Sequence, residues 1–193
     1  MKKFAVGVTG ASGTPIARRL VEQLLAAGCE THVTLSRAGR LVARDELGLQ
    51  DEPKGSVMGI QDERIIEWND KDWNAPFASG SSKFDGLVIC PCSMSTVGAV
   101  AAGIADNLLR RGADVMLKEK RPMVLVPREA PLSEIHLENM LRVARAGGII
   151  IPPVLTFYQG PGEAVSDQVD FIVSRILDHL GVDNDLVPRW GMT

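Results

Sequence analysis

Short apolar runs alternate with longer amphipathic stretches along this chain. Six runs rich in β-branched and other apolar residues have the length of strands, at residues 4–9, 31–36, 64–68, 86–90, 123–127 and 148–151. Six stretches with helical spacing follow them, at residues 15–27, 38–47, 95–105, 107–119, 133–146 and 166–180. Strands that alternate with helices are typical of βαβ units. The pattern predicts a three-layer αβα sandwich with a mostly parallel sheet of the Rossmann or flavodoxin-like kind.

The last helix has the clearest pattern. Its apolar residues recur at the spacing of one buried helical stripe, which consists of Val169, Ile172, Val173, Ile176, Leu177 and Leu180. We therefore expect this helix to pack on the sheet. The polar segments 50–63 and 74–84 are too short to separate two cores, so we expect a single domain over residues 1–193.

The composition of the chain narrows the classes of function that it can have. The chain has 193 residues, 45% of them hydrophobic, and a formal net charge of -3, which disfavours electrostatic binding of nucleic acid or an anionic membrane. The apolar run at residues 4–8 is too short for a signal peptide or a membrane span. Three cysteines, an odd number without the spacing of a zinc pair, fit a reducing compartment. We expect a cytoplasmic protein.

The first strand leads into a glycine-rich junction that reads GVTGASGTP. Its glycines let the backbone approach a ligand, and Thr9, Ser12 and Thr14 offer hydroxyl groups. The spacing is not GxGxxG, and no acidic residue follows the second strand to hold a nicotinamide ribose. Two alternatives stay open here: a tight turn without a ligand, or an NADP phosphate held by Arg37.

The fourth strand ends in a second junction, CPCSMST, which places hydroxyl residues at the start of a helix. The carboxyl ends of parallel strands meet at one edge, so this junction and the first are expected to be neighbours. Two hydroxyl-rich helix starts suit a phosphate monoester and a polar heterocycle, which makes FMN the natural ligand. For any single hydroxyl, such as that of Ser93, helix capping alone is the alternative.

Two further positions carry charge where chemistry is plausible. Arg111 and Lys118 lie two turns apart on one predicted helix face, which suits either an anion or a solvated surface. Arg128 and Glu129 follow the fifth strand, where a surface ion pair is the alternative to a catalytic pair. In the catalytic interpretation Glu129 is a general acid or base.

The chain resembles the UbiX-type flavin prenyltransferases over essentially its whole length. The strings that carry the resemblance are VGVTGASG, ASGSS, CPCSMST, DNLLRRGADVMLKEKRPMVLVPREAPLSEIHLENM, TFY and PRW. It implies an enzyme that joins a dimethylallyl group, delivered as dimethylallyl phosphate, to N5 and C6 of reduced FMN. The prenylated FMN then serves a UbiD-type decarboxylase, and family members form homo-oligomers, commonly dodecamers.

The resemblance also implies roles for individual residues. Gly10, Ala11 and Ser12 line the isoalloxazine ring. The remaining residues of the implied FMN site are Ser36, Ser93, Met94, Ser95, Thr96 and Arg128. The groups implied around the donor phosphate, some of them from neighbouring subunits, are Arg111, Lys118, Tyr158 and Arg175, with Glu46 and Glu129 as nearby carboxylates and Trp190 as a wall. No metal is expected, since the aspartate-rich pair of magnesium-dependent prenyltransferases is missing.

Two departures and two rival functions accompany the resemblance. Gly112 stands where the family usually has alanine, and one residue more than usual separates Tyr158 from Arg175. An FMN-dependent cysteine decarboxylase of the same fold is the first rival, although its Pro-x-Met-Asn element corresponds here to residues 127–130, which read PREA. A non-catalytic flavin carrier is the second, and the charged residues near the implied donor site speak against it.

Overall fold

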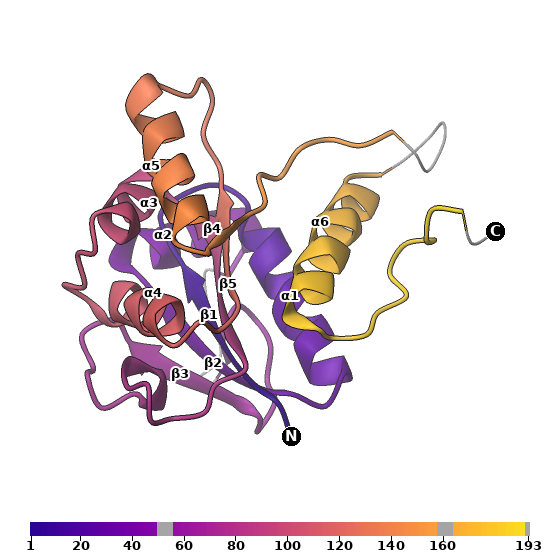
Figure 1. Ribbon diagram of the computed structural model, residues 1–193. Helices are drawn as coiled ribbons and strands as arrows, with labels where there is room; N and C mark the ends of the chain where they lie inside the picture. Colours follow the sequence, from indigo (N-terminus) through magenta and orange to yellow (C-terminus); the bar gives the residue numbers. More distant parts are fainter. Residues whose placement is uncertain (50–55, 158–163, 192–193) are drawn as a thin grey trace.

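A parallel sheet forms the centre of the computed structural model, which describes residues 1–49, 56–157 and 164–191 (Figure 1). Within these residues the sheet has six strands in the order β3-β2-β1-β4-β5-β6, and every neighbouring pair is parallel. The strands are β1 (Lys3–Val8), β2 (Glu30–Leu35), β3 (Ile65–Asn69), β4 (Gly86–Cys92), β5 (Met123–Pro127) and β6 (Ile149–Ile150).

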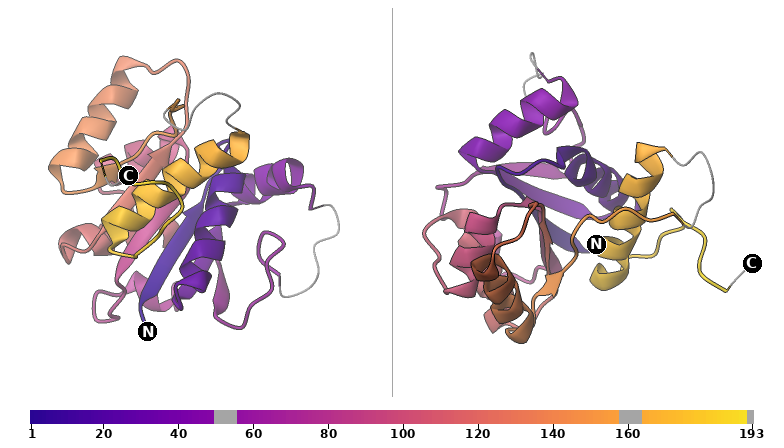
Figure 2. Two further views of the ribbon diagram at one scale, coloured as in Figure 1. Left: turned by 90° about the vertical axis from the view of Figure 1, so that its right-hand side faces the viewer. Right: turned by 90° about the horizontal axis from the view of Figure 1, so that it is seen from above.

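Helices cover both faces of this sheet (Figure 2). They are α1 (Thr14–Ala26), α2 (Arg37–Leu47), α3 (Met94–Ala101), α4 (Leu108–Lys118), α5 (Glu134–Arg145) and α6 (Val165–Leu180), with a short 3-10 helix, η1, at Pro76–Ala78. Side chains of α1, α2 and α6 pack into one apolar cluster on the sheet, and those of α3, α4 and α5 pack into another. The predicted three-layer αβα sandwich is confirmed.

The strand and helix pattern predicted from the sequence agrees closely with the structure. In α6 the stripe that includes Ile172, Ile176 and Leu180 is buried against the sheet, as its spacing predicts. Helix α3 is shorter than predicted, because it ends at Ala101 rather than at residue 105. Gly103 follows with a φ of 69°, a left-handed conformation that ends a helix readily.

Close packing between α4 and the sheet accounts for a glycine in the middle of that helix. Gly112 is buried, and a Cβ atom added there would lie 2.7 Å from Leu87 Cδ1 and 2.9 Å from Phe77 Cδ2. Both neighbours are fully buried, so neither moves away freely. Leu87 and Phe77 therefore leave no room for a side chain at this position.

We predict that Gly112→Ala lowers the free energy of unfolding by about 1 kcal/mol, because overpacking costs more than the gain in helix propensity. Gly98→Ala in α3 is the matched control, since its added Cβ would meet only the end of the Asn139 side chain, at 3.2 Å. That control should be neutral or stabilising. Denaturant unfolding of both variants measures the difference, and equal stability of the two would contradict the packing argument.

Candidate active site

The site begins where the β1 and β4 strands lie side by side and their loops depart in opposite directions. The chain after β1 enters α1 on one face of the sheet, and the chain after β4 enters α3 on the other. Thr9 joins the two loops: its Oγ1 accepts a hydrogen bond from the Ser93 N–H at 2.7 Å and donates to the Pro91 carbonyl at 2.9 Å. Ligands of parallel α/β sheets bind at such a reversal of strand order.

A cavity of about 200 Å³ opens at this point. Helices α2, α3 and α4 all begin beside it, so their unpaired N–H groups give the cavity a positive potential. Its lining consists of Thr9, Gly10, Ser36, Ala38, Ser93, Ser95, Thr96, Asn107, Leu109 and Arg110. Five of the predicted FMN-site residues, Gly10, Ser36, Ser93, Ser95 and Thr96, are therefore gathered around one cavity.

The hydroxyl groups in the cavity differ in what they bind. Ser36 caps α2, since its Oγ accepts from the Gly39 N–H at 3.0 Å. Ser93 occupies the corresponding position of α3, but in the described chain its side chain makes no capping hydrogen bond. Its Oγ lies 3.1 Å from Ser95 Oγ and 3.0 Å from Thr96 Oγ1 instead. Simple capping explains the Ser36 hydroxyl and does not explain that of Ser93.

Two features of the cavity suit an anionic, planar ligand such as FMN. A Cβ atom at Gly10 would lie 2.5 Å from Ala38 Cβ, so only glycine lets the first loop approach the start of α2 this closely. The Nε of Arg110 is buried and has no hydrogen-bond partner in the described part of the chain. Hydroxyls, helix N–H groups and an unpaired guanidinium N–H fit the phosphate and polar edges of a flavin nucleotide.

The other predicted FMN-site residues lie on the same edge of the sheet. Ala11 and Met94 are buried beside the first loop and at the start of α3, and Ser12 is exposed. Arg128 follows β5, and its N–H donates to the Cys92 carbonyl at 3.3 Å. Glu129 is exposed next to it, with Oε1 3.2 Å from the Ala130 nitrogen.

Glu46 holds the end of the first loop. This α2 carboxylate accepts hydrogen bonds from the Gly13 N–H at 3.0 Å, the Thr14 N–H at 2.8 Å and the Thr14 hydroxyl at 2.7 Å. Burial alone would raise the pKa of Glu46, but hydrogen bonds from Ser12, Thr14 and Gly13 outweigh it and hold the pKa below its usual value. Glu46 is therefore an ionised cap for α1, whose own N-cap residue, Gly13, has no side chain.

We predict that Glu46→Ala lowers the free energy of unfolding by about 1 kcal/mol at neutral pH, as loss of a helix cap does. Because the folded state lowers the pKa of Glu46, this stabilisation is present above the unfolded pKa and is lost as pH falls through the folded one. Asp45→Ala, which removes an exposed neighbouring carboxylate, is the control. Equal unfolding curves for the two variants would contradict the capping role.

The implied donor residues on α4 lie beside the loop that follows η1. Arg111 donates from Nε to the Ala78 carbonyl at 3.0 Å and pairs with Asp114 at 2.8 Å. Lys118 forms an ion pair with Glu119 next to Gly80. Arg111 and Lys118 thus share one side of α4, as their spacing predicts, and each is partly exposed.

Arg175, another of the implied donor residues, belongs to the opposite face of the sheet. Arg175 projects from α6 and pairs with Asp178 at 2.7 Å, and Asp178 also accepts from Arg189 at 2.8 Å. The hydrogen bond from Arg189, reinforced by its charge, holds the pKa of Asp178 below its usual value. Trp190 follows and is 89% exposed in the single chain. Tyr158 lies outside the described residues.

A single chain therefore does not bring the whole set of implied donor residues together. Arg111 and Lys118 stand on α4, which packs on one face of the sheet, whereas Arg175 stands on α6, which packs on the other. Figure 1 shows α4 and α6 on opposite sides of the strands. Any one phosphate that contacts all three side chains must lie between copies of the chain.

Four residues of the cavity were not predicted to line a site: Ala38 at the start of α2, and three residues at the start of α4. Asn107, Leu109 and Arg110 belong to the start of α4, which was predicted only as a helix. The Asp-Asn pair before that helix is a capping signal, and Asn107 does accept from the Arg110 N–H at 2.9 Å. Nothing in the spacing indicates that this helix start meets those of α2 and α3.

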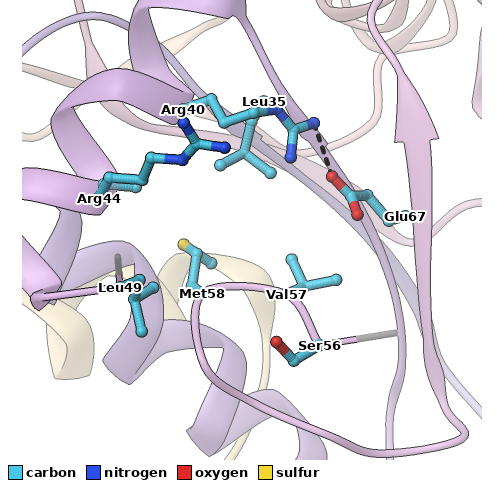
Figure 3. Close-up of a pocket in the computed structure, with 9 residues that line it drawn as sticks. Leu35, Arg40, Arg44, Leu49, Ser56, Val57, Met58 and Glu67 are labelled. Atoms are coloured by element: carbon cyan, nitrogen blue, oxygen red, sulfur yellow. Dashed lines mark hydrogen bonds and ion pairs between the residues drawn. The ribbon is translucent and has the colours of Figure 1, made fainter. Parts of the chain in front are cut away.

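A second, smaller cavity lies between α2 and β3 (Figure 3). Its volume is about 10 Å³, which is room for about one water molecule. Arg40 on its wall donates to Glu67 at 2.7 Å, and the buried hydroxyl of Ser56 has no partner in the described chain. This cavity contains none of the predicted site residues.

Among residues 1–49, 56–157 and 164–191, no three His, Cys, Asp or Glu side chains are grouped so that they could hold a metal ion. No described helix combines the length and the apolar character needed to span a bilayer.

The fold and the hydroxyl-lined cavity define a flavin-binding protein, and comparison with known proteins agrees. The Flavoprotein family model matches residues 1–181. Flavin prenyltransferase UbiX of Pseudomonas aeruginosa is 44% identical over 98% of this chain and 94% of its own length. UbiX of Archaeoglobus fulgidus is 45% identical over 98% of this chain and all of its own. The chain belongs to the family of UbiX flavin prenyltransferases.

Solved structures give the same relationship. The crystal structure of AnUbiX in complex with FMN and dimethylallyl pyrophosphate has a TM-score of 0.89 and 40% identity, covering 98% of this chain and 97% of its own. A dodecameric FMN-dependent UbiX-like decarboxylase from Escherichia coli O157:H7 has a TM-score of 0.87 and 41% identity, covering 97% and 98%. A PPC decarboxylase mutant, at 17% identity and a TM-score of 0.65, shares the fold alone.

Proposed function

We propose that this protein transfers a dimethylallyl group from dimethylallyl phosphate to N5 and C6 of reduced FMN. The allylic C–O bond breaks, phosphate leaves, and C1 of the dimethylallyl group bonds to N5 in place of the N5 proton. The C2–C3 double bond of the attached group then takes up a proton at C2, and C3 bonds to C6 in place of the C6 proton. The observation that carries the proposal is the cavity where the loops after β1 and β4 separate, because its hydroxyl groups and helix starts suit FMN. The relatives of this chain, which match it over nearly their full length, are flavin prenyltransferases.

FMN, in this proposal, lies across the two loops joined by Thr9. Bound reduced flavin supplies the nucleophilic N5 and C6 atoms. The first loop contributes Gly10, Ala11 and Ser12. The start of α3, the cap of α2 and the end of β5 contribute Ser93, Met94, Ser95, Thr96, Ser36 and Arg128. The preformed loop geometry orients the ring without reorganisation of the backbone, which is the main contribution a protein makes to a cofactor's chemistry.

The donor phosphate, in this proposal, binds between subunits. Arg111 and Lys118, the cations of α4, approach it from one copy, and Arg175 approaches it from another. Tyr158 is proposed as a further ligand of the phosphate. Positive groups aimed at the departing phosphate stabilise the charge that develops there, so no metal is needed. The proposed homo-dodecamer is supported by large apolar side chains left exposed on the single chain, among them Ile135, Leu137, Leu141, Leu155, Phe157 and Trp190.

Glu129 is the proposed acid–base group. It is exposed just after the carboxyl end of β5, beside Arg128, on the sheet edge to which the loops after β1 and β4 also lead. It assists departure of the phosphate and then accepts the C6 proton. Trp190 of a neighbouring copy is the proposed wall that keeps water from the allylic cation.

We predict that Glu129→Gln binds FMN with unchanged affinity but forms prenylated FMN about a hundredfold more slowly, the usual contribution of a general acid or base. The measurement is a single-turnover reaction of reduced FMN with dimethylallyl phosphate, followed by the mass of the released flavin. Glu134→Gln, at the exposed start of α5, is the control. An unchanged rate for the Glu129 variant would remove this residue from the mechanism.

We also predict that two inactive variants complement each other. Arg111→Ala and Arg175→Ala should each lose prenylation, because each removes a phosphate ligand. Since the two arginines stand on opposite faces of one chain, mixed oligomers contain some sites in which both are intact. Unfolding and refolding the variants together should restore part of the activity. No gain over the separately refolded variants would contradict a site shared between copies.

The same mass measurement separates the proposed function from its rivals. A flavin carrier would release unmodified FMN, and a cysteine decarboxylase would instead release carbon dioxide from a cysteine-bearing substrate. The likeness to PPC decarboxylase is confined to the fold, so it does not favour that rival. We further propose that the product passes to a UbiD-type decarboxylase and that the protein works in the cytoplasm.

A further inference from the structure

Arg110 stands in the wall of the cavity and has no part in the proposed function above. It is the third residue of α4, two positions after Leu108, and lines the cavity together with Thr9, Ser93 and Thr96. Its side chain is 20% exposed, so the guanidinium is largely enclosed by protein. Arginine stays charged at every physiological pH, so the cavity contains a fixed positive charge.

The hydrogen bonds of Arg110 leave one edge of the guanidinium unused. Nη1 donates to both carboxylate oxygens of Asp106, at 2.8 and 2.9 Å. Nε is buried and has no partner, and Nη2 makes no hydrogen bond within the described residues. The Nε–H and Nη2–H bonds of a guanidinium point in nearly the same direction and together form the fork that binds phosphate or carboxylate side-on.

A buried N–H without an acceptor is unfavourable, so its retention in a ligand cavity points to an acceptor supplied by the ligand. Asp106 turns Nη1 toward itself. Nε has no accessible surface in this conformation, so a ligand reaches the Nε/Nη2 edge only after the guanidinium group turns. The same cavity receives the starts of α2, α3 and α4, whose N–H groups also favour negative charge. The most negative part of a flavin nucleotide is its phosphate.

We propose that Arg110 binds the phosphate of the flavin nucleotide through its Nε and Nη2 edge, with Asp106 as the residue that positions it. The proposal rests on the flavin-binding part of the proposed function and is independent of the prenyl transfer. It makes this cavity the phosphate end of the site, and it places the isoalloxazine ring toward Arg128 and Glu129 at the end of β5.

The test compares FMN with riboflavin, which has the same ring and ribityl chain but no phosphate. Arg110→Gln should weaken the binding of FMN about tenfold or more, the effect of losing a charge-assisted hydrogen bond, and leave the Kd of riboflavin within about twofold of the wild type. It should also reduce the salt dependence of FMN binding. Arg142→Gln, which removes an exposed arginine from the last turn of α5, should change neither ligand's Kd.

The Arg110→Lys variant keeps the positive charge but loses the two parallel N–H donors of the guanidinium. It is the variant to test if Arg110→Gln is unstable. It should bind FMN more weakly than the wild type and riboflavin equally well. Unchanged FMN binding in either stable variant, or equal weakening of FMN and riboflavin, would overturn the proposal. Wild-type protein that binds FMN but yields no prenylated flavin would contradict the proposed function and leave the Arg110 result standing.

Discussion

Parallel pairing of β1 with β4 is the constraint on which the rest of the structure depends. The pairing aligns Gly7 with Ile89, so the loops that follow the two strands emerge together. One loop feeds α1 and the other α3, and these helices pack on opposite faces of the sheet. The hydrogen bonds of Thr9 then hold the two loops at a fixed separation. A ligand crevice results from strand order before any particular side chain is considered.

The structure separates two tasks that the proposed chemistry requires. As proposed, the flavin is held by short polar side chains and backbone groups on loops fixed by the sheet, and by Arg110 at the start of α4. Holding the donor uses long cationic side chains on helix surfaces, where each guanidinium or ammonium is already paired with a carboxylate such as Asp114, Glu119 or Asp178. These pairs keep the cations oriented, and the free N–H groups remain available to a phosphate.

Local sequence pattern predicted nearly all of the elements, because buried strands and amphipathic helices leave a strong periodic signal. It also predicted the hydroxyl-rich ends of β1 and β4, since parallel strands must end on one edge. It did not predict that Arg110 lines the cavity or that Glu46 caps α1, because each depends on a contact between elements far apart in sequence. The placement of Arg111 and Arg175 on opposite faces is likewise a property of the packed layers, which no spacing reveals.

Because α4 and α6 pack on opposite faces of the sheet, the state of assembly affects when the protein becomes active. With the flavin held as proposed, a newly folded protomer carries the residues of the flavin cavity, but only part of the cationic set that the donor needs. With the donor held as proposed, such a protomer stores flavin and stays chemically idle until it meets further copies. Self-association then activates the protein, so the turnover per chain depends on the local concentration of the protein.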